Sequence, residues 1–484
     1  MKLAFDPGDE NRFWEAVESI PGYPRAEGRP IQAMLFEPDA LEQLSGVLEA
    51  IGVPRPGPLL AVMDPTPMRR GRDSLKPLLL DRLAHTGWQV KKLVLEPDRT
   101  GQVHSDMFQI ERVQRELRSG AALLAIGSGT ITDIAKHAAF LAGQETGSRI
   151  RFAVLPTANS VSAYTSNMAP TFVHTLKRTL PSRYPDAVIC DLKTLRDAPH
   201  EMTVAGAGDL LAMFVSVPDW YLACRLGLDS GYSELPRLLL GSLDTILLEQ
   251  AEGIGSPTLE AMAILAKLVI LGGLAMSLSH ATTPMSGFEH EMSHLLDLQA
   301  KVAGRPLAVH GTQVGLTAVI GAASYGHFLG ELEPAEVEVE RCYPAPPQVQ
   351  AKILEGFAKL DPTGKVGGEF WSGYRVKLEA WHAHRAEFVS VLKEWPQMRR
   401  EIQSRTCRPE LLVRILRAIG APLDFRQLTP PVDEPEVRFA FENAPFMRRR
   451  MTIADLLVFL SWDRERLWHE VWRESRELGE GATR

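Results

Sequence analysis

The stretch Ala121-Ala-Leu-Leu-Ala-Ile-Gly-Ser-Gly-Thr-Ile-Thr-Asp-Ile-Ala-Lys136 decides the fold of this chain. Its first six residues are apolar and lie between two glycines, which is typical of a strand buried on both faces in a parallel sheet. Gly127 and Gly129 allow a tight turn, and Thr130 or Thr132 is predicted to cap the helix that follows. The start of such a helix attracts anions. Because the pattern is neither G-x-G-x-x-G nor a P-loop, an ordinary strand-to-helix connection stays open at this point.

Short apolar runs alternate with helical patterns through the first 195 residues. Besides the opening stretch, strands are predicted over residues 59–63, 90–95, 151–155 and 187–191. Helices are predicted over residues 11–19, 39–51, 74–85 and 107–119. This alternation predicts a doubly wound parallel sheet. Asp64 follows the first of these strands, at the edge where such sheets contact a ribose or an adenine, although a solvated loop aspartate fits the same position.

Strand patterns fade beyond residue 196, and long apolar-periodic stretches take their place. Helices are predicted over residues 201–227, 235–252, 258–280, 288–302, 312–329, 348–359, 371–394, 397–404, 409–419 and 451–476, with a proline-rich loop at 430–435. The fold class expected is therefore an α/β N-terminal domain with a parallel Rossmann-like sheet, followed by an all-helical C-terminal domain. We place the dinucleotide-binding domain at residues 1–195 and the helical metal- and substrate-binding domain at residues 196–484.

Composition narrows the class of protein. The 484 residues include 53 Lys and Arg against 60 Asp and Glu, a net charge of −7, which is a poor match to a nucleic-acid-binding protein. Four cysteines without a Cys-x-x-Cys pair argue against a disulfide framework and fit a reducing compartment. The first residues lack an apolar signal region, and the apolar stretch 261–278 contains Lys267 and two glycines, which favours a buried core helix. We expect a cytoplasmic protein without a membrane partner.

Two histidines stand at helical spacing within the predicted helix 288–302. His290 and His294 are four residues apart, so both rings project from one helix face. The residues between them complete H-E-x-x-H, the metalloprotease motif in which Glu291 would be the general base. The extended form of that motif fails because Ala300 occupies the position of its third histidine. The short pattern recurs by chance, so we do not favour a protease.

A different set of residues suits a metal better. Asp209 ends the run Val204-Ala-Gly-Ala-Gly-Asp209, and His310 begins a predicted helix. Asp209, His290 and His310 offer one oxygen and two nitrogens, a three-ligand site suited to zinc, nickel or iron(II) that keeps a position open for a substrate oxygen. The alternative is that Asp209 caps a helix and that each histidine is a hydrogen-bonded core residue.

Five motifs in order resemble a known family. They are Gly127-Ser-Gly-Thr-Ile-Thr-Asp133-x-x-Lys136, Pro156-Thr-Ala-x-Ser160, Ala205-Gly-x-Gly-Asp209, Glu289-His290-x-x-x-His294 and His310-Gly-x-Gln-Val-Gly315. This series is similar to the sn-glycerol-1-phosphate dehydrogenases, which are grouped with iron-containing alcohol dehydrogenases, glycerol dehydrogenase and dehydroquinate synthase. Ser128 and the stretch Tyr164-Thr-Ser166 resemble the bacterial branch. The similarity covers roughly residues 55–330, and the stretch from Arg448 resembles the family's C-terminal helix.

The resemblance implies roles for the motif residues. The cofactor NAD(H) or NADP(H) would be bound by Asp64, Gly127, Gly129, Thr130, Ile131, Thr132, Asp133, Thr157, Ala158, Asn159, Ser160 and Ser166. One divalent metal (Zn, Ni or Fe) would be held by Asp209, His290 and His310, with Asp209 and His294 as catalytic residues. The substrate would contact Ser162, Asp209 and His294.

Three positions depart from the family pattern. Ser162 stands where the family has a substrate-contacting aspartate, Met213 where bacterial members have a lysine, and Thr312 where the family has a glutamate. The lost carboxylate and the lost ammonium weaken the prediction of substrate, while the metal triad is intact.

We therefore expect a metal-dependent NAD(P)H oxidoreductase that reduces dihydroxyacetone phosphate or a related ketone, with a place in phospholipid metabolism. Three alternatives stay open: another polyol or alcohol substrate, a dehydroquinate-synthase-like lyase, and a non-catalytic relative. The expected partner is a small-molecule substrate, with no nucleic acid, and we expect a homo-oligomer.

Overall fold

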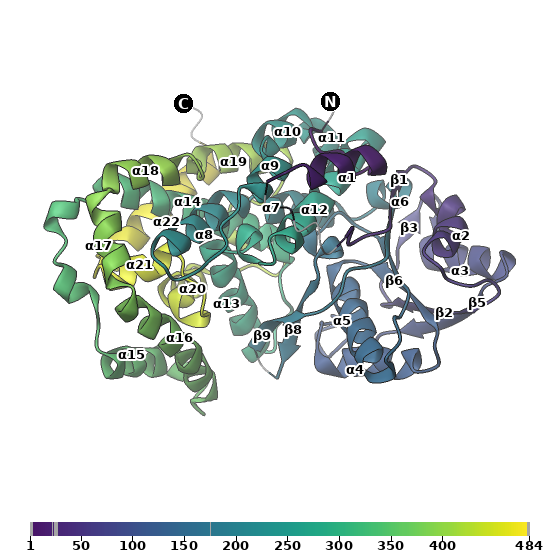
Figure 1. Cartoon of the computed structure of the whole chain (residues 1–484), viewed down its shortest axis with the longest axis horizontal. Coiled ribbons are helices and arrows are strands. Elements are labelled where there is room, and N and C mark those ends of the chain that lie inside the picture. Colours follow the sequence, from purple (N-terminus) through teal and green to yellow (C-terminus); the bar gives the residue numbers. More distant parts are fainter. Residues whose placement is uncertain (1–2, 22, 24–27, 175, 482–484) are drawn as a thin grey trace. The chain divides into compact units, whose positions relative to one another are not determined.

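The parallel sheet expected from the sequence is present in the computed structural model, which describes residues 3–21, 23, 28–174 and 176–481. Six strands pair in parallel in the order β1-β10-β7-β6-β2-β5. Their bounds are β1 Ala33–Glu37, β2 Pro58–Met63, β5 Gln89–Val94, β6 Ala122–Gly127, β7 Phe152–Pro156 and β10 Ala187–Asp191. Figure 1 labels β1, β6, β2 and β5 of this sheet. Every residue of β6, β7 and β10 is buried, as continuous apolar runs in a parallel sheet require. The predicted fold class is confirmed, and β1 is an edge strand that the sequence analysis missed.

The helix after the glycine turn begins earlier than its threonines suggested. Helix α5 (Gly129–Thr146) has Ser128 as its N-cap residue, and no side chain caps it. Thr132 instead donates its hydroxyl to the Ser128 carbonyl oxygen from within the first turn, at 3.1 Å. The predicted threonine cap is therefore wrong, because the turn after β6 is so short that the helix starts directly at the second glycine.

The other helices of this region agree with their predicted positions to within two residues. They are α1 Glu10–Glu18, α2 Ala40–Ala50, α3 Leu75–His85 and α4 Met107–Leu117. Two antiparallel hairpins were not anticipated, β3 Arg69–Arg70 with β4 Asp73–Ser74, and β8 Met168–Val173 with β9 Leu176–Pro181. The first hairpin is only two residues long on each side, which leaves no alternating pattern to detect.

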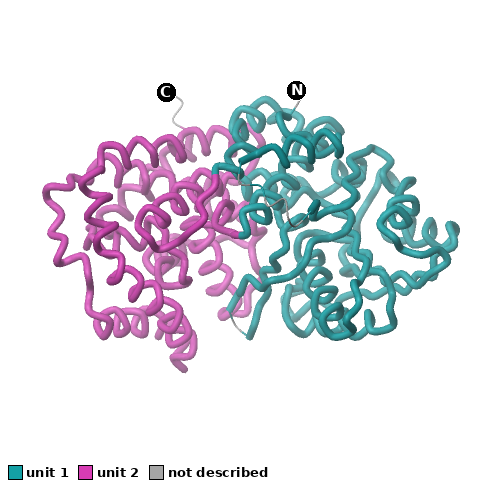
Figure 2. The backbone as a smooth tube through the Cα atoms, viewed as in Figure 1, with its two compact units in different colours: residues 1–210, 234–280 teal, residues 211–233, 281–484 magenta. Residues whose placement is uncertain are grey.

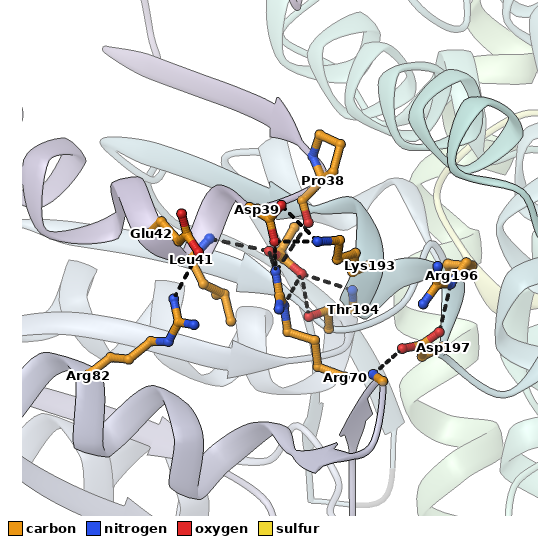
Figure 3. A network of polar contacts seen from close by, with 12 residues as sticks. Pro38, Asp39, Leu41, Glu42, Arg70, Arg82, Lys193, Thr194, Arg196 and Asp197 are labelled. Atoms are coloured by element: carbon orange, nitrogen blue, oxygen red, sulfur yellow. Dashed lines mark hydrogen bonds and ion pairs between the residues drawn. The ribbon is translucent and has the colours of Figure 1, made fainter.

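The first hairpin is tied to the carboxyl edge of the sheet by Arg70. Its guanidinium contacts both carboxylate oxygens of Asp191, at 2.9 and 3.1 Å, and Oδ1 of Asp39 at 2.7 Å. Lys193 also donates to Asp39, so two cations meet two carboxylates there (Figure 3). Asp191 additionally accepts from the backbone N–H of Leu41 and caps helix α6 (Leu192–Arg196). The network fixes the ends of β1 and β10 relative to each other.

The chain divides into two compact units (Figure 2). Unit 1 consists of Met1–Leu210 with Glu234–His280, and unit 2 of Leu211–Ser233 with Ala281–Arg484. Unit 1 thus extends past residue 195 and takes up the helices α7 (His200–Leu210), α9 (Leu235–Leu240), α10 (Leu243–Glu249), α11 (Ala251–Gly255) and α12 (Leu259–Leu278). The division of function between 1–195 and 196–484 stays a prediction.

Glycines explain why α7 and α12 belong with the sheet. A Cβ at Gly206 of α7 would lie 1.8 Å from the carbonyl oxygen of Asn159. A Cβ at Gly273 of α12 would lie 2.2 Å from the hydroxyl oxygen of Thr165 and 2.3 Å from the carbonyl oxygen of Ser162. Only glycine permits so close an approach of the loop after β7 to both helices.

Helix α12 is the one helix in the described part of the chain that is long and apolar enough to cross a membrane. Of its most apolar window, 89% is buried. The prediction of a buried core helix is confirmed.

Unit 2 is helical in its described residues. Its longer helices are α8 Met213–Arg225, α13 Phe288–Val302, α14 His310–Glu331, α15 Pro346–Ala358, α16 Lys365–Ala383, α17 Arg385–Lys393, α18 Trp395–Gln403, α19 Pro409–Ala418, α20 Glu434–Met447, α21 Ile453–Phe459 and α22 Arg464–Glu480. The prolines around residue 435 hid α20, although a proline in the first turn is compatible with a helix start. Residues 451–476, predicted as one helix, form α21 and α22.

Candidate functional site

The glycine turn of unit 1 has the geometry of a phosphate site. A Cβ at Gly129 would lie 2.3 Å from a methyl carbon of Val161, so the start of α5 and the loop after β7 are in direct contact. The backbone N–H of Thr157 donates to the carbonyl oxygen of Gly127 at 3.1 Å and joins the two segments again. Because no side chain caps α5, its first N–H groups are left to a ligand, and the helix dipole favours an anion there. An anionic group fits this helix start.

Asp133 and Lys136 lie one turn further along α5. Lys136 is fully buried, pairs with Asp133 at 2.9 Å, and donates to the carbonyl oxygens of Ala163 and Met168 at 2.9 and 2.7 Å. Burial raises the pKa of Asp133, against the lowering effect of Lys136. The pair anchors the loop after β7 to α5, so Asp133 is placed to position this loop.

The predicted cofactor residues of the loop after β7 are held by their own hydrogen bonds. Ser160 shares a 3.1 Å hydrogen bond with the Tyr164 hydroxyl, which donates to the carbonyl oxygen of Ala158 at 2.7 Å. Asn159 donates its amide to the carbonyl oxygen of Met262 at 3.2 Å. Both contacts rigidify the loop, whose residues 162–165 form a short 3₁₀ helix. A rigid loop suits a cofactor site, which must hold its ligand in one orientation.

Two further predicted cofactor residues form hydrogen bonds with residues close to them in the chain. Asp64, after β2, accepts from Lys76 at 2.7 Å and from Thr66 at 2.6 Å. Ser166 accepts at its hydroxyl from the backbone N–H of Met168, at 3.1 Å. Both side chains are thereby held in place.

Asp209 stands near the end of α7, two positions before Leu211, where unit 2 begins. Its Oδ2 accepts two hydrogen bonds from Ser162, from the backbone N–H at 2.9 Å and from the hydroxyl at 2.8 Å. The predicted metal ligand and the residue that departs from the family pattern are therefore direct partners. Sequence spacing gave no indication of this contact.

The three predicted histidines come together within unit 2. The ring centres of His290 and His310 lie 5.1 Å apart, those of His294 and His310 5.4 Å, and those of His290 and His294 5.8 Å. The rings of His290 and His294 are one turn apart on α13, as the four-residue spacing predicted, and His310 belongs to α14.

Hydrogen bonds to Nδ1 orient two of the rings. Nδ1 of His290 lies 2.8 Å from Oε1 of Glu289, an acceptor only, so this nitrogen carries the proton. Nδ1 of His310 lies 3.3 Å from the hydroxyl of Ser293, which donates to Gln313 at 3.2 Å and accepts from the ring. In both rings the lone pair is consequently on Nε2. A histidine whose Nδ1–H is held by an acceptor is the usual arrangement of a metal ligand, so these residues fit a divalent ion.

His294 has the opposite tautomer. Its Nδ1 accepts a hydrogen bond from Nη2 of Arg448, and a guanidinium has no lone pair to offer. The proton of a neutral His294 is consequently on Nε2, where it can be donated. His294 thus differs from its two neighbours by being a hydrogen-bond donor, which suits a substrate contact. Arg448 was not identified as a site residue from the sequence, where it was assigned to a terminal helix.

Glu291 faces a different part of unit 2 from the histidines. Its Oε2 accepts from the hydroxyl of Thr452 at 3.2 Å, and Thr452 also caps α21. Lys377 and Asp455 form a buried ion pair of 2.6 Å in the same region. A metalloprotease needs this glutamate beside the metal-bound water, so its contacts argue against that alternative.

Comparison with known proteins places these residues in a family. Glycerol-1-phosphate dehydrogenase (NAD(P)+) of Bacillus subtilis is 30% identical over 318 residues, which cover 63% of this chain and 77% of the relative. The chain belongs to the glycerol-1-phosphate dehydrogenase family. The dehydrogenase of the same name from Methanococcoides burtonii is 30% identical over 245 residues, 50% of this chain and 64% of the relative. The sequence model of the iron-containing alcohol dehydrogenases matches residues 79–199 of this family member.

Solved structures of other dehydrogenases share the fold of this chain. A glycerol dehydrogenase from Schizosaccharomyces pombe superposes with a TM-score of 0.55 at 12% identity, covering 93% of this chain and 92% of that one. A probable glycerol dehydrogenase from Sinorhizobium meliloti gives 0.54 at 15% identity, covering 93% and 98%. These two structures therefore share with this chain the fold of an α/β sheet followed by helices.

Proposed function

We propose that the protein is a metal-dependent NAD(P)H oxidoreductase that reduces dihydroxyacetone phosphate, or a related ketone, by hydride transfer. The observation that carries the proposal is the contrast between the three histidines. His290 and His310 present Nε2 lone pairs, whereas His294 beside them presents an N–H. This arrangement suits two metal ligands next to a residue that hydrogen-bonds a substrate oxygen. The relatives' name supports the activity and the cofactor.

In this proposal Asp209, His290 and His310 hold one divalent metal. The ion, when bound, supplies Lewis-acid polarisation of the substrate carbonyl. Glu289 and Ser293 keep the two imidazoles in the ligating tautomer, and Ser162 orients the Asp209 carboxylate. Each proposed ligand therefore has a protein partner behind it.

The cofactor residues are proposed on similar grounds. The uncapped start of α5 would bind the phosphates of NAD(P)H, and the loop after β7 would hold the nicotinamide against the substrate. Asp64, at the carboxyl end of β2, would face the adenosine end. The cofactor supplies the hydride, and these residues supply its position.

The proposal is tested by steady-state oxidation of NADH and of NADPH with dihydroxyacetone phosphate, using protein purified without a chelator. We expect the dinucleotide to be oxidised only when the metal is bound, with formation of glycerol phosphate. Turnover without net oxidation of the dinucleotide would indicate a lyase, and no turnover of any ketone by metal-loaded protein would refute the proposal. The cytoplasmic location and the homo-oligomer stay predictions.

The substrate departures are tested in the same assay. A Ser162→Asp, Met213→Lys variant restores both family side chains. A kcat/KM for dihydroxyacetone phosphate that rises ten- to a hundredfold, the equivalent of one charge-assisted hydrogen bond, would mean that the natural chain prefers another ketone. An unchanged or lower value would mean that other residues bind the phosphate.

A further inference from the structure

Two arginines of unit 2 contact His294 or the segment that precedes its helix. They belong to the short segment 448–450 between α20 and α21, and Arg448 is the C-cap residue of α20, with extended backbone. Arg448 contacts the hydroxyl of Ser286 at 3.4 Å in addition to Nδ1 of His294. Arg450 donates to the hydroxyl of Thr282 at 2.5 Å. Both side chains therefore point from this segment toward residues 282–294.

The guanidinium of Arg450 is not fully satisfied by protein atoms. Its Nη1 is buried and lacks a hydrogen-bond partner among the described residues. No carboxylate of the described chain lies within ion-pair distance of Arg450. Burial lowers the pKa of Arg450, and the carboxylates of Glu291, Glu289, Asp229 and Asp219 act against this lowering without contacting the guanidinium. Glu291 accepts from Thr452 and Glu289 from Gly287, and each of the two keeps one buried oxygen without a hydrogen-bond partner. A buried guanidinium N–H without an acceptor costs free energy that an anionic ligand would recover.

The surroundings of the two guanidinium groups are rich in donors. The hydroxyls of Thr282 and Ser286 stand beside them, and His294 carries its proton on the nitrogen that Arg448 does not contact. Planar guanidinium groups match the oxygens of a phosphate in paired hydrogen bonds, and a phosphomonoester offers enough acceptors for several donors. The ring of His294 also lies next to those of His290 and His310, the proposed metal ligands.

We propose that Arg448 and Arg450 bind the phosphate group of a phosphorylated ketone substrate. This inference rests on the proposed function and names the substrate class of the same site. The arginine pair supplies the positive charge that Met213 does not provide. His294 links the arginines to the proposed metal ligands, because Arg448 contacts its Nδ1 and the rings of His290 and His310 lie beside its own. The natural chain therefore retains preference for a phosphorylated substrate in spite of its departures from the family pattern.

Arg450→Gln is the decisive variant, because this side chain contacts Thr282 and not His294. We expect kcat/KM for dihydroxyacetone phosphate to fall by about ten- to a hundredfold, which is the effect of losing charge-assisted hydrogen bonds. The kcat/KM for unphosphorylated dihydroxyacetone should change less than about threefold, because the activation barrier for this substrate does not depend on a phosphate contact. Arg449→Gln, at the exposed position between the two arginines, is the matched control and should alter neither value. Equal losses for both ketones in Arg450→Gln would overturn the proposal.

A binding measurement decides the matter independently of turnover. Inorganic phosphate should raise the Tm of the full natural chain and of Arg449→Gln, and should do so much less for Arg450→Gln. If Arg450→Gln does not fold, Arg450→Lys keeps the charge and loses the paired geometry, and it should show a weakened phosphate shift. An equal phosphate shift in all variants would overturn the proposal. If the natural chain reduced neither ketone, the proposed function would fail, while the phosphate shift would still test the arginine pair.

Discussion

Ser162 donates both its backbone N–H and its hydroxyl to a single oxygen of Asp209, Oδ2, at 2.9 and 2.8 Å. Two donors on one oxygen fix the orientation of the carboxylate. The family resemblance places an aspartate at position 162, where a second carboxylate would stand against Asp209. Serine thereby turns a like-charge neighbour into a hydrogen-bond donor, which gives Ser162 a role in positioning the proposed metal ligand.

Changing Ser162 to alanine tests that role. Alanine keeps the backbone hydrogen bond and removes the one from the hydroxyl, so the carboxylate loses part of its support. We expect metal affinity to fall about ten- to a hundredfold, as it does when partners of metal ligands are removed. Competition with a chelator, followed by metal analysis, measures the change. Ser160→Ala is the control, because that hydroxyl contacts Tyr164 and not Asp209, and equal affinity in both variants would contradict the role.

The histidine ligands are tested by metal content. His290→Ala and His310→Ala should each lower the metal retained by purified protein from one ion per chain to well below that, because two ligands hold a divalent ion poorly. His327→Ala is the sharpest control. His327 lies with Glu331 and Glu470 in a second group whose spacing suits a metal, on the helices α14 and α22. If only His327→Ala lost the ion, the metal would be bound by His327, Glu331 and Glu470 instead.

Glu291 separates the dehydrogenase from the hydrolase interpretation. Because its carboxylate accepts from Thr452, Glu291→Gln keeps an acceptor oxygen for that hydroxyl and leaves the histidines untouched. We expect dehydrogenase activity to stay within about tenfold of the natural protein, a barrier change near 1.4 kcal/mol. A complete loss of activity in a folded Glu291→Gln protein would show that this carboxylate takes part in the chemistry.

Asp219 makes the stability of unit 2 depend on pH. Burial, reinforced by the carboxylate of Glu289, raises the pKa of Asp219 to about 8 from an ordinary value of 3.8. Its oxygens accept from Tyr325 and from the backbone N–H groups of Phe288 and Ile453. The folded state binds the proton more tightly, so this contribution to stability is complete below pH 4 and is lost as pH rises through about 8.

Asp219→Asn removes that titration. The free energy of unfolding of the natural chain, measured with urea, should decline relative to the variant between pH 5 and 8, by at most about 1.4 kcal/mol per pH unit. Asp361→Asn provides the comparison. Hydrogen bonds from Val366 and Thr363 lower the pKa of Asp361, so this group titrates below pH 5. The free energy of unfolding of Asp361→Asn should therefore differ from that of the natural chain by a constant amount between pH 5 and 8. A constant difference for Asp219→Asn as well would refute the prediction.

The parallel sheet, the glycine turn and the histidine pair on α13 could all be predicted from the sequence. Each leaves a local signal: an uninterrupted apolar run for a strand buried on both faces, glycines where the backbone turns, and four-residue spacing for two side chains on one helix face. The same local signals missed β1 and the hairpins, which are short and partly exposed. They also missed α20, whose prolines resemble those of a loop.

The sequence by itself determined the fold class, the family and the candidate ligands, because each of these rests on short motifs whose own residues are close together in the chain. Only the tertiary structure decided that α12 packs with the sheet, through the contact of Gly273 with the loop after β7. It also decided the tautomers of His294 and His310, and the pairing of Ser162 with Asp209. Arg448 and His294 are 154 positions apart, and Ser162 and Asp209 are 47 apart. Hydrogen bonds over such separations leave no periodic pattern, because the partners meet only after the helices that carry them have packed.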